Sequence, residues 1–170
     1  GGGDWNTADI DHWWAGDHYQ FWNNEGNDSA VFGVTNGSAG QVYLKTPIVV
    51  ENITFNPPGS GSYTIIQSGT ANPLLLAGNP VITANAEAAI QAGISNATAS
   101  GVGLVKEGGG TLTLAGTPSY PNTYSGLTTV NAGTLVLAHG EADNSAVPTD
   151  GSTGTGAGGR HTGGRRRDTY

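Results

Sequence analysis

The densest cluster of titratable side chains lies near the N-terminus and consists of Asp9, Asp11, His12, Asp17 and His18. In an extended chain, Asp9 and Asp11 would point the same way, and two carboxylates on one side are what a Ca²⁺ site needs. The two histidines would instead suit a transition metal. Because the spacing matches no standard calcium-binding loop, we expect solvated loop residues, with a metal site at Asp9 and Asp11 as the alternative.

Tryptophan is concentrated in the same region, at Trp5, Trp13, Trp14 and Trp22, and nowhere else in the chain. Large aromatic side chains can cover the apolar end of a stack of strands, and this capping role is the one we expect first. Exposed indole rings can instead stack on sugars, which makes Trp13, Trp14 and Trp22 a candidate glycan site. Burial separates the two roles, because a cap requires shielded rings and a sugar platform requires open ring faces.

Outside the N-terminal region, the sequence contains few residues that could act in catalysis. Residues 52–103 contain one acidic residue, Glu87, and no Lys, Arg or His, and the chain has no Cys. Lys106 and Glu107 are expected to form a charged pair at a turn. We therefore expect a protein that is not an enzyme and holds no cofactor.

Charge is distributed unevenly along the chain, whose formal net charge is −7. Residues 1–44 contain no Lys or Arg, whereas the C-terminal tail carries Arg165, Arg166 and Arg167. Three arginines on an acidic protein are a weak basis for nucleic-acid binding, so no nucleic-acid partner is expected. A solvated tail is the plain interpretation, and attraction between the tail and the acidic end of another copy is the alternative.

The elements that must position these residues are expected to be strands. Gly contributes 29 of 170 residues and charged residues only 11%, a composition that disfavours helices. Thr111–Leu114 and Thr134–Leu137 alternate, with Leu on one face. Such strands bury their apolar side when stacked coil on coil, so an all-β solenoid is the first prediction and a β-sandwich the alternative. The predicted strands are Gln41–Leu44, Ile48–Phe55, Tyr63–Ile66, Leu74–Leu76, Val81–Thr83, Ala88–Ile90, Gly103–Val105, Thr111–Leu114, Thr128–Val130 and Thr134–Leu137.

Residues 103–116 read GLVKEGGGTLTLAG, and residues 124–137 read YSGLTTVNAGTLVL. This pair of segments resembles the autotransporter-associated β-strand repeat. Leu127 stands where such repeats often have Gly, and Thr117–Thr123 contains two Pro, but neither change breaks the strand pattern. The resemblance implies a right-handed parallel β-helix from the passenger part of an autotransporter-like protein, located outside a Gram-negative bacterium.

Three segments are expected: a Trp-rich cap at 1–40, β-helix coils at 41–138 with the repeat at 103–137, and a Gly/Thr/Arg-rich tail at 139–170. No apolar run reaches the roughly 18 residues that a membrane helix needs. The predicted function is a non-enzymatic extracellular module that forms a stalk, coat or self-assembling fibre with copies of itself. The alternative is an adhesive or carbohydrate-binding passenger module that uses the Trp-rich segment to bind surface glycans.

Overall fold

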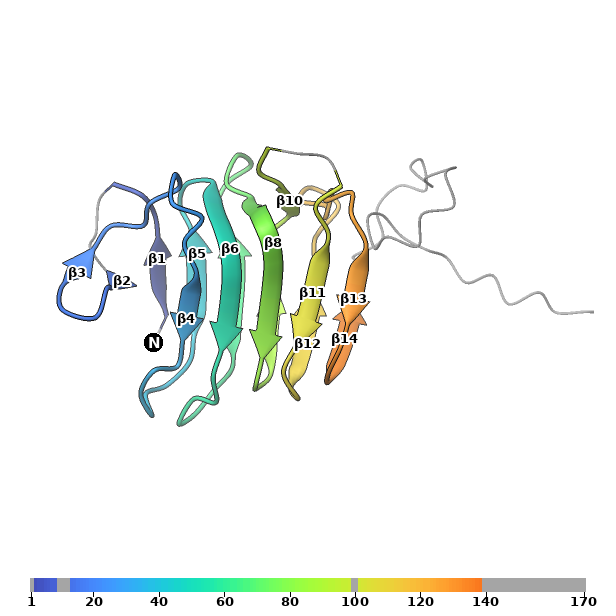
Figure 1. The fold of residues 1–170 in the computed structure, drawn as a ribbon. Coiled ribbons are helices and arrows are strands. Elements are labelled where there is room, and N and C mark those ends of the chain that lie inside the picture. Colours follow the sequence, from blue (N-terminus) through green and yellow to red (C-terminus); the bar gives the residue numbers. More distant parts are fainter. Residues whose placement is uncertain (1, 9–12, 99–100, 139–170) are drawn as a thin grey trace, which may run out of the picture.

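The computed structural model describes residues 2–8, 13–98 and 101–138, and within these residues every regular element is a β-strand (Figure 1). Accordingly, no helix in the described part is long and apolar enough to cross a membrane. The strands are β1 (Gly3–Trp5), β2 (Trp13–Trp14), β3 (Tyr19–Gln20), β4 (Ala30–Phe32), β5 (Gln41–Leu44), β6 (Ile48–Phe55), β7 (Tyr63–Gln67), β8 (Leu74–Ala84), β9 (Ala88–Ile90), β10 (Ile94–Asn96), β11 (Leu104–Glu107), β12 (Thr111–Leu114), β13 (Thr128–Val130) and β14 (Thr134–Leu137).

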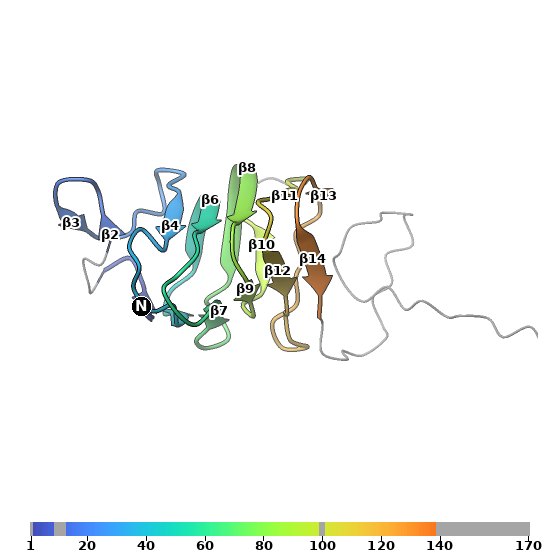
Figure 2. The same cartoon turned by 90° about the horizontal axis from the view of Figure 1, so that it is seen from below.

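Two long sheets run along the molecule, and every strand pair within them is parallel. One sheet has the order β1-β5-β7-β9-β12-β14, and the other has the order β13-β11-β8-β6-β4, with β10 also paired to β8. The chain crosses from one sheet to the other and back, so that each turn adds one strand to each sheet (Figure 2). The fold is therefore an all-β parallel solenoid of about 4 turns, which confirms the predicted fold class.

The core consists of columns of apolar side chains that repeat from coil to coil. In one column Val42 is paired with Ile65, Ile65 with Ile90 and Ile90 with Leu114. All four side chains are buried. Each such Leu, Ile or Val side chain contributes about 1.5–3 kcal/mol when it is removed from water. Burial between coils is thus the main force that holds the strands together, since the described residues contain no disulfide.

β8 combines two segments that the sequence predicted as separate strands. Its pairing with β6 shifts register between Val50 and Asn52, opposite a bulge at which Gly78 has φ 60°. The Asn52 side chain accepts a hydrogen bond from the Val81 N–H at 3.0 Å, which satisfies a donor where the regular ladder is interrupted. The strand continues because this side chain replaces a missing backbone acceptor.

Lys106 lies inside the solenoid instead of at a surface turn, so the predicted turn pair is wrong. Its side chain is fully buried, and Nζ donates to the carbonyl oxygens of Glu107 and Gly108 at 2.7 Å and of Ala132 at 3.0 Å. Burial lowers the pKa of this ammonium, while the nearby Glu107 carboxylate acts in the opposite direction. Because Ala132 belongs to the last coil, Lys106 links that coil to the one before it.

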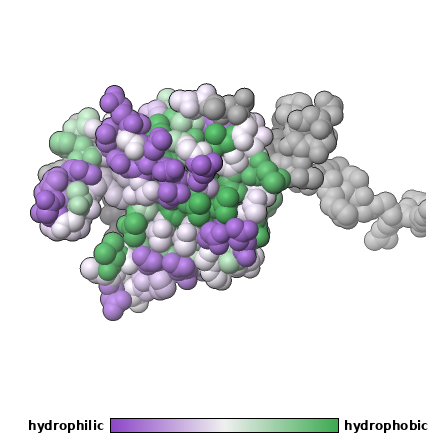
Figure 3. Space-filling model, in the orientation of Figure 1, coloured by the Kyte–Doolittle hydropathy of each residue, from purple (hydrophilic) through white to green (hydrophobic). Residues whose placement is uncertain are grey.

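The two ends of the solenoid differ. At the N-terminal end, β1 and β4 already belong to the long sheets, so the coils begin inside the segment expected to be a cap. At the C-terminal end, Val130, Val136 and Leu137 of the last coil are exposed to between 39% and 46%. Hydrophobic residues also reach the surface of the face that carries β8 and β11 (Figure 3).

Candidate functional site: an aromatic groove at the N-terminal end

A cluster of aromatic rings closes the N-terminal end of the core. The Trp5 ring lies 4.8 Å from the rings of both Trp13 and Trp22, and 5.8 Å from the Phe32 ring, between ring centroids. Trp5 and Trp22 are buried, with exposures of 1% and 4%. Tilted and edge-to-face contacts of this kind stabilise aromatic pairs beyond the area that they bury. These two tryptophans therefore act as the expected cap.

The indole nitrogens of the two buried tryptophans differ in their surroundings. Trp22 Nε1 donates to the Val49 carbonyl oxygen at 3.0 Å, which fixes the ring over β6. Trp5 Nε1 is buried and finds no hydrogen-bond partner. The cluster continues inward from Phe32 to Phe55, whose rings stack at 5.3 Å, and to Tyr63. Burial raises the pKa of the Tyr63 hydroxyl.

The hairpin β2–β3 divides the remaining aromatic residues into an inner and an outer set. Trp13 is paired with Gln20, and Trp14 with Tyr19. Because successive side chains of a strand point to opposite faces, Trp13 packs against the core while Trp14 points outward. Trp14 is 58% exposed and Tyr19 is 61% exposed, with their ring centroids 5.1 Å apart.

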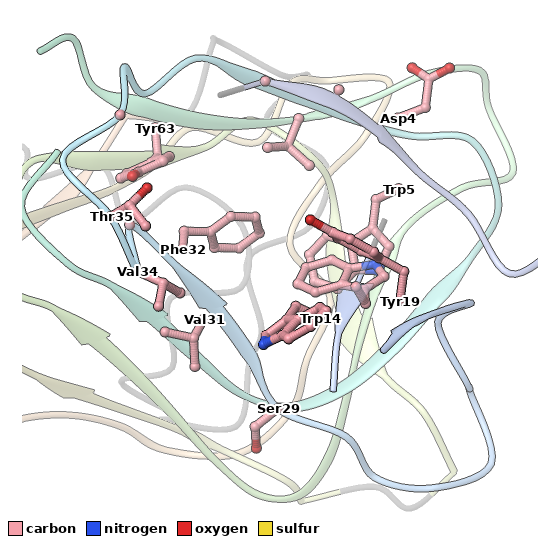
Figure 4. A pocket seen from close by; sticks show the side chains of 16 residues that line it. Asp4, Trp5, Trp14, Tyr19, Ser29, Val31, Phe32, Val34, Thr35 and Tyr63 are labelled. Atoms are coloured by element: carbon pink, nitrogen blue, oxygen red, sulfur yellow. The ribbon is translucent and has the colours of Figure 1, made fainter. Parts of the chain in front are cut away.

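These residues border a groove of about 830 Å³, which we call the N-terminal groove (Figure 4). One wall is formed by β1 and the preceding Gly2, and another by β4 and the loop that follows it. The hairpin residues Trp14 and Tyr19 lie beside these walls. Its lining residues include Asp4, Trp14, Tyr19, Val31, Phe32 and Val34.

The groove has one acidic residue, Asp4, among its lining residues. Asp4 forms an ion pair with Lys45, with Nζ 3.6 Å from the carboxylate oxygen. Both side chains of this pair are 41% exposed, so the pair contributes at most about 1 kcal/mol. Lys45 is the first cation of the sequence, after a stretch without Lys or Arg.

The predicted glycan residues occupy different environments. Trp13 and Trp14 line the groove, whereas Trp22 lies buried behind it with no open ring face. Sequence reasoning did not assign Tyr19, Val31 or Val34 to a site. The signal for Tyr19 was its place in an aromatic segment with a turn residue, Gly16, between it and Trp14.

The other predicted site residues are not brought together by the described structure. Asp9, Asp11 and His12 lie outside the described residues, as do Arg165, Arg166 and Arg167. Asp17 and His18 lie on the exposed hairpin turn and hydrogen-bond to each other. Within residues 2–8, 13–98 and 101–138, no group of three or more His, Asp or Glu side chains could hold a metal ion.

Comparison with known proteins identifies a known repeat in the C-terminal strands of the solenoid. Residues 104–137, which form β11 to β14, match the passenger-associated-transport-repeat. This match confirms the predicted resemblance to the autotransporter passenger repeat, and the matched residues form the C-terminal strands of the parallel solenoid.

Over 142 residues the chain is 37% identical to the adhesin BmaC autotransporter of Brucella suis biovar 1 (strain 1330). The alignment covers 79% of this chain and 4% of that protein, so the chain spans a small part of the relative's length. No solved structure is significantly similar to the chain.

Proposed function

We propose that this chain is an adhesive segment of a β-helical passenger exposed on the surface of a Gram-negative bacterium, and that the N-terminal groove makes the adhesive contact. The observation that carries this proposal is the exposure of Trp14 and Tyr19 beside the groove. The similarity to an autotransporter that is named an adhesin supports it.

The geometry of the groove suits a contact surface. Aromatic side chains contribute most of the binding energy at many interfaces, because they bury a large area with few rotatable bonds. Behind the exposed pair lie the buried rings of Trp5 and Trp22, which hold the hairpin in place. The stacked coils supply a rigid support, so little entropy is lost when the groove is filled.

A bead adhesion assay tests this function. Polystyrene beads coated with the full chain would be counted on cultured epithelial cells, for the native protein and for the double variant Trp14→Ala/Tyr19→Ala. Loss of two exposed aromatic contacts is expected to lower binding at least about tenfold. The matched control is Leu127→Ala, which removes a side chain that is 66% exposed at the opposite end of the solenoid.

Equal adhesion by the native protein and the double variant would contradict the proposed site. Treating the target cells with periodate or with protease shows which class of ligand the groove binds. Sensitivity to periodate indicates a glycan ligand, which is the alternative role that the sequence left open for Trp14. Sensitivity to protease indicates a polypeptide ligand.

A stalk or self-assembling fibre is the second candidate function, and the exposed apolar side chains of the last coil favour it. Val130 and Leu137 would be buried if another copy stacked on this end. Sedimentation velocity over a range of concentrations tests the idea. Self-association that disappears in Leu137→Asp supports a fibre, and a monomer at every concentration contradicts it.

A further inference from the structure

The two long sheets do not end at the same level at the N-terminal end. The first begins with β1, which pairs with β5, and β5 follows β4 along the chain. The second begins with β4, which pairs with β6 and with no other described strand. The strand position next to β4, level with β1, is therefore vacant among the described residues, and the N-terminal groove lies there.

The backbone of β4 presents hydrogen-bonding groups to this vacant position. The Phe32 carbonyl oxygen faces β6, since it accepts from the Asn56 N–H at 3.0 Å. Groups of successive residues point to opposite edges of a strand, so the Val31 N–H and C=O point away from β6. An unpaired edge of this kind is a template for an added strand.

The groove also offers apolar contacts to the side chains on both faces of an added strand. Side chains on its inner face would meet the aromatic cluster around Phe32, while those on its outer face would lie beside Val31, which is 46% exposed. Trp14 and Tyr19 stand beside the same space (Figure 4). A strand with alternating apolar and polar residues fits this arrangement.

Charge selects among extended chains. The described residues from 2 to 44 carry Asp4, Asp17, Glu25 and Asp28 and no Lys or Arg. The single neighbouring cation, Lys45, is already paired with Asp4. A strand flanked by Lys or Arg is therefore attracted to this end, and an acidic one is repelled.

We propose that the N-terminal groove binds an extended basic segment of another polypeptide, which adds as a parallel strand to the free edge of β4. This inference rests on the proposed adhesive role of the groove and assigns its ligand class. A sugar would use the ring faces of Trp14 and Tyr19 but would leave the row of backbone groups at Val31 without a specific partner.

The register of the solenoid predicts which backbone groups of the ligand matter. Within the coils, a residue whose side chain points inward directs its backbone toward the next coil, as Phe55 does when its carbonyl accepts from the Asn85 N–H at 2.9 Å. In an added strand, the inward-facing residues would likewise direct their N–H groups to β4.

The probe is the peptide acetyl-Lys-Val-Thr-Val-Thr-Val-Lys-amide, titrated into the full chain labelled with ¹⁵N, with binding followed by the amide shifts of Val31 and Phe32 and, in variants that lack the Val31 amide, by that of Phe32 alone. N-methylation of the Val residues, which face inward, is expected to weaken binding at least tenfold. N-methylation of the Thr residues is expected to change it less than threefold. An analogue with Glu in place of both Lys is expected to bind at least tenfold more weakly.

A protein variant tests the same bond from the other side. Val31→Pro removes the N–H at the free edge, where proline is tolerated, and is expected to weaken binding at least tenfold. Val31→Thr keeps the N–H and is expected to bind like the native protein. If Val31→Pro unfolds, the N-methylated peptides still decide the matter.

Equal effects of the two N-methylation patterns, or no binding of the basic peptide, would overturn the inference. Adhesion that depends on Trp14 while the peptide fails to bind leaves the proposed function standing and points to a glycan. Adhesion that does not depend on Trp14, together with specific peptide binding at Val31, removes the adhesive role but keeps the strand site.

Discussion

The N-terminal end of this solenoid is closed by aromatic rings, whereas the outer side of its last coil is not covered by any of the described residues. Trp5 is 1% exposed at the first end, and Leu137 is 46% exposed at the other. Both residues lie in the same long sheet, so their different burial comes from what covers them and not from the strand pattern. A parallel solenoid is stable in its middle by repetition, but each end requires its own solution.

Burial also differs between two leucines whose positions look equivalent in the sequence. Leu114 and Leu137 are the last residues of the matching segments Thr111–Leu114 and Thr134–Leu137. They are paired with each other in β12 and β14. Leu114 is fully buried because β9 and β14 lie on both sides of it. Among residues 2–8, 13–98 and 101–138, Leu137 has a neighbouring coil on one side only.

The largest effect is expected for Trp5→Ala, which removes the ring that contacts Trp13, Trp22 and Phe32. The unfolding free energy should fall by about 3–5 kcal/mol, because a large cavity opens in the cap. Urea denaturation followed by far-ultraviolet circular dichroism measures it. The control Trp14→Ala, at an exposed ring, should cost less than about 1 kcal/mol.

Leu114→Ala and Leu137→Ala compare one column position in a middle coil and in the last coil. The first should cost about 2–5 kcal/mol and the second less than about 1 kcal/mol, because only the first leaves a cavity. The same urea assay measures both. Equal losses would mean that the last coil is covered in solution.

Lys106→Met tests the link between the last coil and the coil before it. The variant keeps the volume but leaves three carbonyl oxygens without their donor, so the unfolding free energy should fall by about 2–3 kcal/mol. Urea denaturation monitored by amide exchange should show the loss first in β13 and β14. An unchanged midpoint would mean that the carbonyl bonds merely offset the burial of the ammonium.

Smaller effects on the unfolding free energy are expected from alkaline pH, with opposite signs for Tyr63 and Lys106. Burial raises the pKa of Tyr63 above its usual value near 10, so its contribution to stability is present below that pH and is lost as pH rises through the folded-state pKa. Burial lowers the pKa of Lys106, so the unfolded chain binds this proton more tightly and the contribution of Lys106 increases as pH rises toward about 10.4.

Urea denaturation between pH 8 and 11 should therefore separate two variants. Tyr63→Phe should lose less stability than the native protein at the upper end of this range. Lys106→Met should lack the gain that the native lysine provides. Parallel curves for the variants and the native protein would contradict these assignments.

Most of the fold could be predicted from local patterns. The alternation of Thr111–Leu114 and Thr134–Leu137 predicted two stacked strands, and β12 and β14 occupy those residues and pair in parallel. The short strand β10 was missed because Ile94–Asn96 has a single apolar residue. Its pairing with β8 depends on a neighbour that local sequence does not specify.

The site was less predictable because it depends on contacts between distant residues. Trp22 is held in the core by a hydrogen bond to the carbonyl oxygen of Val49, which lies 27 residues away, and nothing near Trp22 in the sequence indicates that partner. Lys106 follows the inward-facing Leu104 at a spacing of two, so its direction could be read from the alternation. The convergence of three backbone carbonyl oxygens on its ammonium group could not be predicted from the sequence.

Amide hydrogen exchange across the full chain tests the contrast between the two ends most directly. We expect the amides of β6, β8 and β12 to exchange slowest, those of β1 and β5 beneath the aromatic cap to be nearly as protected, and those of β13 and β14 to exchange much faster. If β13 and β14 were as protected as β8, or if β1 and β5 exchanged as fast as the last coil, the account of a closed first end and an open last coil would be contradicted.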